Sequence, residues 1–316
     1  MREERALSVD FESSGPTRTD SRSITRRRFL RAGCALVAGG MAVTASGALY
    51  STQLEPSWIE IAEVDVRLPG LPPALDSLTI AQLSDLHLGP HVSARDVARA
   101  VERTNALGAD LIVVTGDYVY GSAAYSAPCA QELAALRAPY GTFAVLGNHD
   151  IWTDAEQVAA NLSAAGIGIL RNQAIPLSSQ GAALWLVGVE DTGLLAGTFG
   201  DFRALWQPAA TALARLLKEI PPDEARVLLV HNPDFTEMLP EDRVDLALCG
   251  HTHGGQVRLP LLGAPIVPSC FGQKYAGGLV AGSQTTVYVN RGIGVIAPPV
   301  RFNCRPEITL LRLKSG

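Results

Sequence analysis

The stretch Gly147-Asn148-His149-Asp150 follows directly on the apolar run Thr-Phe-Ala-Val-Leu at positions 142–146. The run predicts a buried strand, so the polar residues emerge together at its carboxyl end. An Asn, a His and an Asp at a strand end offer a metal ligand, a proton donor and a residue to orient that donor. For an isolated tetrapeptide, a turn that happens to contain Asn and Asp would be the simpler interpretation.

The tetrapeptide is not isolated, because four further apolar runs end in carboxylates or imidazoles. They are 78–83 before Asp85 and His87, 111–114 before Asp117, 226–230 before His231, and 244–249 before His251 and His253. On an extended backbone, Asp85 and His87 would point to one face. Together the runs account for five of the six histidines and leave only His91.

The motifs Asp-x-His, Gly-Asp, Gly-Asn-His-Asp, His and Gly-His-Thr-His, in this order, resemble those of the calcineurin-like metallophosphoesterase family. The resemblance covers roughly residues 56–314. It implies two metal sites: Asp85, His87 and His253 for one ion, Asn148, His231 and His251 for the other, and Asp117 as the bridge. It also implies that His149 is a non-ligand histidine beside the substrate, with Asp150 as its orienting partner.

The implied chemistry is hydrolysis of a phosphate ester. Two divalent ions acidify a shared water and clamp the attacking and leaving oxygens of an in-line displacement. Carboxylate, imidazole and amide ligands without thiolate favour Mn, Fe, Zn or Ni over a structural zinc site. The sequence leaves the identity of the two ions open.

The N-terminal region, residues 1–54, predicts a disordered segment followed by an export signal. Residues 1–24 are polar and charged, which predicts disorder. The segment Thr25-Arg26-Arg27-Arg28-Phe29-Leu30-Arg31 and the uncharged stretch 32–54 resemble a twin-arginine signal. Ser46-Gly47-Ala48 offers a cleavage site, whereas 32–50 is just long enough to span a bilayer. Either way, the catalytic part is expected outside the cytoplasmic membrane, after passage through the twin-arginine machinery.

The rest of the chain, residues 55–316, predicts the catalytic domain. Without residues 1–50 the formal charge is −8, and no basic cluster remains, which argues against nucleic acid as a partner. Cys249 lies inside an apolar run and predicts a small buried side chain. Cys270 and Cys304 could pair in an exported protein, although a twin-arginine substrate normally folds in a reducing compartment.

The predicted fold class is α/β. Residues 58–69 alternate and predict a half-exposed strand. The expected helices are 93–107, capped by Ser93 with Asp96, and 127–136, 154–165 and 208–220. Strands are expected at 184–189, 285–289 and 308–313. The resemblance implies a central sandwich of two sheets flanked by helices, a four-layer architecture.

The segments 254–260, 290–294 and 299–308 resemble an exported or membrane-anchored branch of the family related to cell-envelope phosphodiesterases. Some members of that branch and more distant relatives cleave the pyrophosphate of a lipid-bearing UDP-sugar, of the UDP-diacylglucosamine type. The expected activity is therefore that of a phosphodiesterase or pyrophosphatase acting on an envelope substrate, with a lipid-linked glycolipid as one candidate. The alternatives are a phosphomonoesterase or protein phosphatase on the same core and, less favoured, a non-catalytic scaffold.

Three features bear on the substrate. The loop 259–268, rich in Pro and Gly, either folds back on the core or displays its apolar side chains beside the metals. If it is displayed, it would suit a lipid-bearing substrate near a membrane. Arg301 could then pair with a second phosphate. Asp191, at the end of strand 184–189, either approaches the site or serves as a turn residue, and the turn is favoured.

Overall fold

The computed structural model describes residues 26–179, 181–193 and 202–316, so the disorder expected for residues 1–24 lies outside the described residues. The chain divides into two compact units, Met1–Gly47 and Ala48–Gly316. Helix α1 (Arg26–Leu49) covers the uncharged N-terminal stretch. Within the described ranges, no helix combines the length and apolarity needed to cross a membrane.

The first of two six-stranded sheets has the order β1-β12-β2-β3-β4-β5. Its strands are β1 (Glu60–Leu68), β2 (Thr79–Leu83), β3 (Leu111–Thr115), β4 (Thr142–Val145), β5 (Gly168–Ile169) and β12 (Glu307–Ser315). Strands β2 to β5 are parallel, and the last strand of the chain, β12, lies between β1 and β2. The expected strands 78–83, 111–114 and 308–313 correspond closely to β2, β3 and β12.

The second sheet has the order β10-β11-β9-β8-β7-β6. Its strands are β6 (Gln173–Ser179), β7 (Ala182–Gly188), β8 (Ala225–Leu229), β9 (Leu246–Cys249), β10 (Gly278–Ala281) and β11 (Thr286–Val289). The four inner strands are parallel, and β6 and β10 close the edges antiparallel. The parallel strands of both sheets therefore present their carboxyl ends as sites for functional loops.

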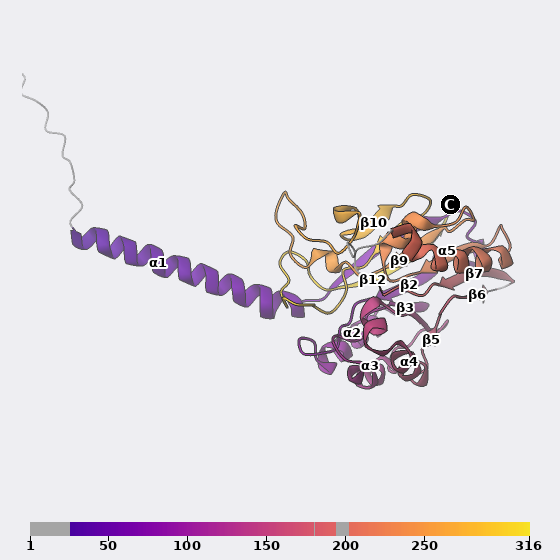
Figure 1. Ribbon diagram of the computed structural model, residues 1–316, viewed down its shortest axis with the longest axis horizontal. Helices are drawn as coiled ribbons and strands as arrows, with labels where there is room; N and C mark the ends of the chain where they lie inside the picture. Colours follow the sequence, from indigo (N-terminus) through magenta and orange to yellow (C-terminus); the bar gives the residue numbers. More distant parts are fainter. Residues whose placement is uncertain (1–25, 180, 194–201) are drawn as a thin grey trace, which may run out of the picture. The chain divides into compact units, whose positions relative to one another are not determined.

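Alternation along the strands builds three apolar layers. In β3, Leu111 and Val113 face the second sheet, whereas Ile112 and Val114 face the helices. Figure 1 shows α2 (Ala94–Asn105), α3 (Ser126–Leu133) and α4 (Asn148–Ala164) grouped together, and these helices cover the outer face of the first sheet. Helix α5 (Phe202–Glu219) covers the second sheet. The predicted fold class, a two-sheet sandwich flanked by helices, is confirmed.

The start of helix α2 agrees with the prediction from sequence, and the start of helix α4 does not. The predicted cap of α2 is confirmed, because the Ser93 hydroxyl accepts the Asp96 N–H while the Asp96 carboxylate accepts the Ser93 N–H. Helix α4 was expected from residue 154, but it begins at Asn148 and is interrupted at Asp154 (φ −171°, ψ 94°). His149 therefore lies in the first turn of a helix rather than in a loop.

Short helical turns complete the chain: η1 (Tyr50–Leu54), η2 (Glu55–Ser57), η3 (Pro73–Leu75), η4 (Ala123–Tyr125), η5 (Pro233–Met238), η6 (His253–Gly255) and η7 (Gly272–Tyr275). Segment η1 belongs to the larger unit, where the Arg301 N–H donates to the Ser51 carbonyl. The larger unit thus begins a few residues before the expected boundary at residue 55.

Candidate metal centre

Five of the residues expected to bind metal have left-handed backbone conformations. Their φ values lie between 49° and 71°, and the residues are Asp85, His87, Asp117, His251 and His253. Asp and His tolerate this region better than most side chains, yet each such residue carries strain that the surrounding fold must hold. Asp85 and His87 are therefore brought together by tight turns beyond β2, and the expected extended backbone at this point was wrong.

Glycine lets the motif loops approach one another. A Cβ on Gly147 would lie 2.3 Å from the Asp117 Oδ1, and a Cβ on Gly250 would lie 2.4 Å from the Asp85 Oδ2. Both distances are impossible for real atoms, so neither position can hold a larger residue without moving the neighbouring carboxylate. The glycines of the sequence motifs thus serve the packing of one motif against the next.

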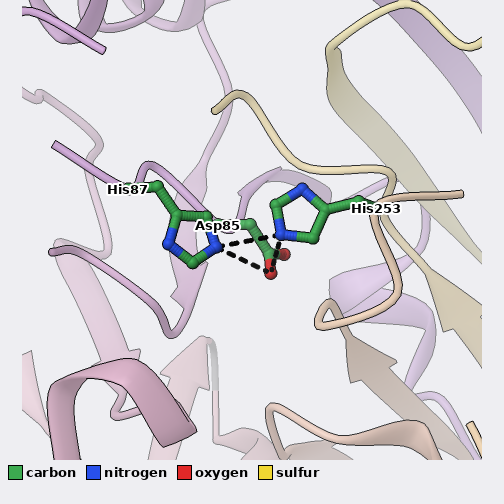
Figure 2. Close-up of side chains that lie close together, drawn as sticks. All are labelled: Asp85, His87 and His253. Atoms are coloured by element: carbon green, nitrogen blue, oxygen red, sulfur yellow. Dashed lines mark hydrogen bonds and ion pairs between the residues drawn. The ribbon is translucent and has the colours of Figure 1, made fainter. Parts of the chain in front are cut away.

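Asp85, His87 and His253 form the first group of converging ligand atoms, shown in Figure 2. The Nε2 atoms of the two histidines are 2.9 Å apart. The Asp85 Oδ1 lies 3.3 Å from the Nε2 of His253 and 3.9 Å from that of His87. All three side chains are buried. The three potential metal ligands thus converge on a common point.

His231 is the middle of the second group. Its Nδ1 lies 2.7 Å from the Thr115 carbonyl oxygen, which can only accept, so this nitrogen carries the proton. The Nε2 then faces two oxygens that accept, the Asn148 Oδ1 at 3.1 Å and the Asp117 Oδ2 at 3.2 Å. It also lies 3.3 Å from the His251 Nδ1, whose role depends on the tautomer of that ring. A second proton on His231 or a bound cation would satisfy the two oxygens.

Asp117 lies between the two groups. Its Oδ2 is 3.4 Å from the His87 Nε2 as well as 3.2 Å from the His231 Nε2. Burial alone would raise the pKa of Asp117, but the charge of His231 outweighs it and holds the pKa well below the usual range. Conversely, burial would lower the pKa of His231, and Asp117 raises it well above the usual range. The proton that joins this pair occupies the place a cation would take.

The donor set fits divalent metal. Burial lowers the pKa of His87 and of His251 to about 3, so both imidazoles are neutral and keep a lone pair for a metal. Burial raises the pKa of Asp85 to about 6, which shows the cost of a carboxylate here without a compensating cation. The Thr115 carbonyl fixes the tautomer of His231, as the outer partners of metal-binding histidines do. These clusters of ligand atoms indicate a divalent metal centre.

His149 borders the centre on its open side. Its backbone N–H donates to the Asp117 Oδ1 at 2.8 Å, and its ring lies 4.7 Å from the His87 ring, centre to centre. Two aromatic side chains that sequence reasoning missed enclose it: Trp152 at 4.6 Å and Tyr120 at 5.3 Å. Trp152 follows His149 by three residues on a helix, a spacing that would have indicated the contact had the helix been predicted there.

Asp150 does not orient His149, and that expectation was wrong. The fully buried carboxylate accepts four backbone N–H groups, those of Asp117, Tyr118, Val119 and Gly147. It sits at the start of α4 and binds the loop after β3 to the turn after β4. Its role is therefore to hold the backbone that carries Asp117.

Arg301 is not available to a second phosphate. Its side chain is buried, and its guanidinium donates to the carbonyl oxygens of Arg291, Gly292, Gly294 and Cys304. Such a cation organises the loop after β11 and cannot also reach the surface. The expected contact with substrate therefore has no support in the structure.

The other two open questions concern Asp191 and the cysteine pair. The Asp191 Oδ1 accepts the Gly193 N–H at 2.8 Å, the contact of a turn residue, while Gly193 in turn accepts the Trp152 indole N–H. Burial raises the pKa of Asp191 to about 6. Cys270 is exposed and Cys304 is buried, and neither forms a disulfide. Asp191 thus supports Trp152, and no disulfide joins the two cysteines.

An apolar pocket of about 400 Å³ adjoins the first ligand group, because His253 lines both. Its walls come from the segments 252–257, 265–268 and 296–300 and include Ile266, Ile296 and Val300. The loop 259–268 does not fold over the core as one alternative held, since Leu261 is fully exposed and Ile266 is 79% exposed. The centre is thus flanked by an apolar recess on the His253 side.

Comparisons with known proteins agree with this geometry. Residues 78–255 match the family described as calcineurin-like phosphoesterase. A metallophosphoesterase of Bacillus subtilis, YkuE, is 33% identical over 298 residues, which cover 93% of this chain and 99% of the relative. Phosphodiesterase YaeI of Escherichia coli is 35% identical over 297 residues, which cover 92% and 99%. The family match covers all the motifs that meet at the centre, from Asp85 to His253.

Proposed function

Since the chain belongs to the calcineurin-like phosphoesterase family and is a phosphoric ester hydrolase, we propose that it uses two divalent ions to hydrolyse phosphodiester or pyrophosphate bonds of a lipid-bearing envelope substrate. One observation carries the substrate part of the proposal: His253 lines both the ligand cluster and the apolar pocket. A phosphate held at the centre thus has an apolar recess within reach of its ester group. The relative named a phosphodiesterase supports the diester.

The two ligand groups would hold one ion each, with Asp117 shared between them. When bound, such ions lower the pKa of water and neutralise the charge that builds up on the phosphoryl oxygens. The chain's own contribution is to hold these donors rigidly in a buried place. The strained turns, the Thr115 carbonyl behind His231 and the Asp150 carboxylate behind Asp117 all serve that end.

His149 would give a proton to the leaving oxygen. Its ring belongs to a group with His87 and Asp117 yet is only partly buried, so it can meet both the phosphoryl group and solvent. Tyr120 and Trp152 restrict its ring. Replacing His149 with Ala should slow esters with poor leaving groups about 10²–10⁴-fold more than activated aryl esters, which depart without a proton. An equal loss on both kinds of ester would instead assign His149 to positioning.

The apolar pocket would receive an acyl chain of the substrate. Ile266 lines the pocket but is mostly exposed to solvent. A substitution there therefore changes the pocket without disturbing the packing of the core. Removing one aliphatic contact typically costs about 1–3 kcal/mol in a hydrophobic pocket, or roughly tenfold or more in KM. A small water-soluble diester does not reach this recess and should be unaffected.

The test compares metal-loaded wild type with Ile266→Asp on an acylated diester, an acylated pyrophosphate, a small soluble diester and a soluble monoester. Leu279→Asp is the matched control, because Leu279 is also exposed (50%) but lies on β10 outside the pocket. A higher KM for acylated substrates in Ile266→Asp alone is expected. Equal effects on all substrates would remove the lipid part of the proposal. Higher turnover of the monoester than of every diester would favour the alternative, a phosphomonoesterase or protein phosphatase.

We further propose that the chain is exported by the twin-arginine route and held at the outer side of the cytoplasmic membrane or released there. The arginines Arg26 and Arg27 and the uncharged stretch that follows them in α1 support this proposal. Retention of an Arg26→Lys, Arg27→Lys variant in the cytoplasm, compared with wild type by cell fractionation, tests it.

A further inference from the structure

The turn Leu259–Gly263 displays leucine side chains to solvent. Leu261 is fully exposed and Leu262 is 71% exposed, and we call these two residues the apolar tip. Single exposed apolar residues are common on protein surfaces. Here two adjacent leucines share one loop with Ile266 (79% exposed), which makes a cluster rather than a single exposed residue.

The apolar tip is held in place by its surroundings. The Leu259 and Gly263 backbones exchange hydrogen bonds at 2.8 and 3.0 Å, and the Gln273 side chain donates to the Leu262 carbonyl. Leu261 has a φ of 68°, a strained conformation for a bulky residue. Ala264, by contrast, is buried against Gly255 and anchors the loop to the body. The fold therefore maintains both strain and exposure at this turn.

The charges around the apolar tip match an anionic lipid surface. Residues 259–273 contain no Asp, Glu, Lys or Arg, and the flanking residues are Arg258 and Lys274. Residues 296–300, which line the other side of the pocket, are likewise uncharged. Lys274 is ion-paired with Glu237, so Arg258 is the cation that this border offers to a lipid. In a chain with a net charge of −5, an uncharged apolar loop with an arginine at its edge matches a membrane-contacting segment.

Aromatic side chains of the larger unit lie beside the loop. The Phe302 carbonyl accepts the Arg258 N–H, which places Phe302 beside the start of the loop. The ring of Tyr50 packs edge-on against Phe302 at 6.4 Å, and Leu54 is 54% exposed. In the same part of the larger unit, Arg305 stacks on the exposed ring of Trp58 at 3.5 Å. Aromatic, aliphatic and basic side chains thus continue from the loop to the first residues of the larger unit.

We propose that the apolar tip and Phe302 form a surface that docks on an anionic lipid bilayer. Leu261 and Leu262 enter the boundary between headgroups and acyl chains, and Arg258 meets lipid phosphates. Because the exposed Ile266 lines the pocket and belongs to the same loop as the apolar tip, docking brings the mouth of the pocket to the membrane surface. This inference concerns binding alone and does not depend on the substrate proposed above.

A fluorescent probe on the full chain tests the docking even where the N-terminal helix itself binds lipid. The exposed thiols Cys34 and Cys270 are first replaced with Ser, and NBD is then attached to Leu262→Cys or, as control, to Lys218→Cys on exposed α5. Emission is recorded with vesicles of phosphatidylcholine, with and without phosphatidylglycerol, and with brominated acyl chains as quenchers. Turnover of a soluble diester shows that each labelled protein is folded and active.

The expected result is a blue-shifted emission and quenching by brominated lipid at position 262 and neither effect at position 218. Phosphatidylglycerol should strengthen both effects, and Leu261→Ser with Leu262→Ser should weaken vesicle binding of the unlabelled chain about tenfold or more. An unchanged emission at position 262 would overturn the proposal, whether or not the protein sediments with vesicles. Equal quenching at both positions would overturn it as well, since the contact would then be non-specific.

Discussion

Replacing Asp150 with Ala should destabilise the protein and disturb the metal centre together. The carboxylate accepts the N–H groups of Asp117, Tyr118 and Gly147 at 2.9 Å each and that of Val119 at 3.3 Å. A hydrogen bond to a charged group is worth about 1.5–3 kcal/mol, and a buried N–H left without an acceptor costs about 1–3 kcal/mol. Because the loops can relax and admit water, we expect a net loss of about 3–5 kcal/mol, the range for removing one partner from a buried charged network.

This loss can be measured by calorimetry of the metal-loaded chain. At about 2–4 °C per kcal/mol for a domain of this size, Tm should fall by roughly 10 °C. Asp150→Asn keeps one acceptor oxygen for two of the four N–H groups and should lose about half as much. Asp154→Asn is the control, because this exposed carboxylate in the same helix accepts only the Gln157 N–H and Asn caps a helix equally well.

The two roles considered for Asp150 predict different results. A residue that positions the Asp117 loop should lower both Tm and bound metal, and should slow all ester substrates alike. A residue that orients His149 should leave Tm and metal content unchanged and slow only esters with poor leaving groups. A Tm within 2 °C of wild type, with full metal content, would refute the positioning role.

Four further predictions concern the metals, export and Arg301. Asp117→Ala should remove activity and bound metal more completely than loss of one terminal ligand, because it serves both groups, and near-normal turnover at saturating Mn would contradict two-metal binding. Because burial raises the pKa of Asp85 to about 6, protons should compete with metal as the pH falls through about 6, so metal affinity measured by titration should decline below that pH. Arg26→Lys with Arg27→Lys keeps the charge and should abolish export through the twin-arginine route, and undiminished export in a fractionation assay would reject that route. Arg301→Lys cannot serve the same four carbonyl oxygens and should lower Tm by several degrees without changing KM for any phosphate ester, whereas a raised KM with normal Tm would restore its predicted contact with substrate.

Sequence patterns were sufficient for the parallel strands that precede the motifs and for the residues that meet at the centre, but not for β5, β6 and β10. Apolar runs in β2 to β4 and in β8 and β9 mark buried parallel strands, and a polar residue after such a run must emerge at the same edge. The order of the motifs then indicated the family, which the comparisons confirm. The metal-binding roles of the individual residues remain predictions.

The predicted roles that were wrong concern side chains whose hydrogen-bond partners are backbone groups. Nothing in the sequence shows that Asp150 accepts backbone N–H groups of another loop. Nor does it show that Arg301 donates to backbone carbonyl oxygens. Periodicity also could not show that Asp85 and His87 adopt left-handed conformations, since strain of this kind is maintained by tertiary packing. The predicted start of α4 at residue 154 was too late, because His149 and Asp150 were expected in a loop and they lie in the first turn of the helix.

The position of β12 makes the first sheet depend on contacts between distant parts of the sequence. This strand lies between β1 and β2 and pairs with both. Contacts of such high sequence separation form slowly, because the entropy of closing a long loop is lost before the strand pairing compensates for it. The turn after β2 that carries Asp85 also takes its neighbours from the loop after β11 and from His251. The first ligand group is therefore expected to take shape late in folding, and a destabilised β12 should slow its formation more than it slows formation of the helices.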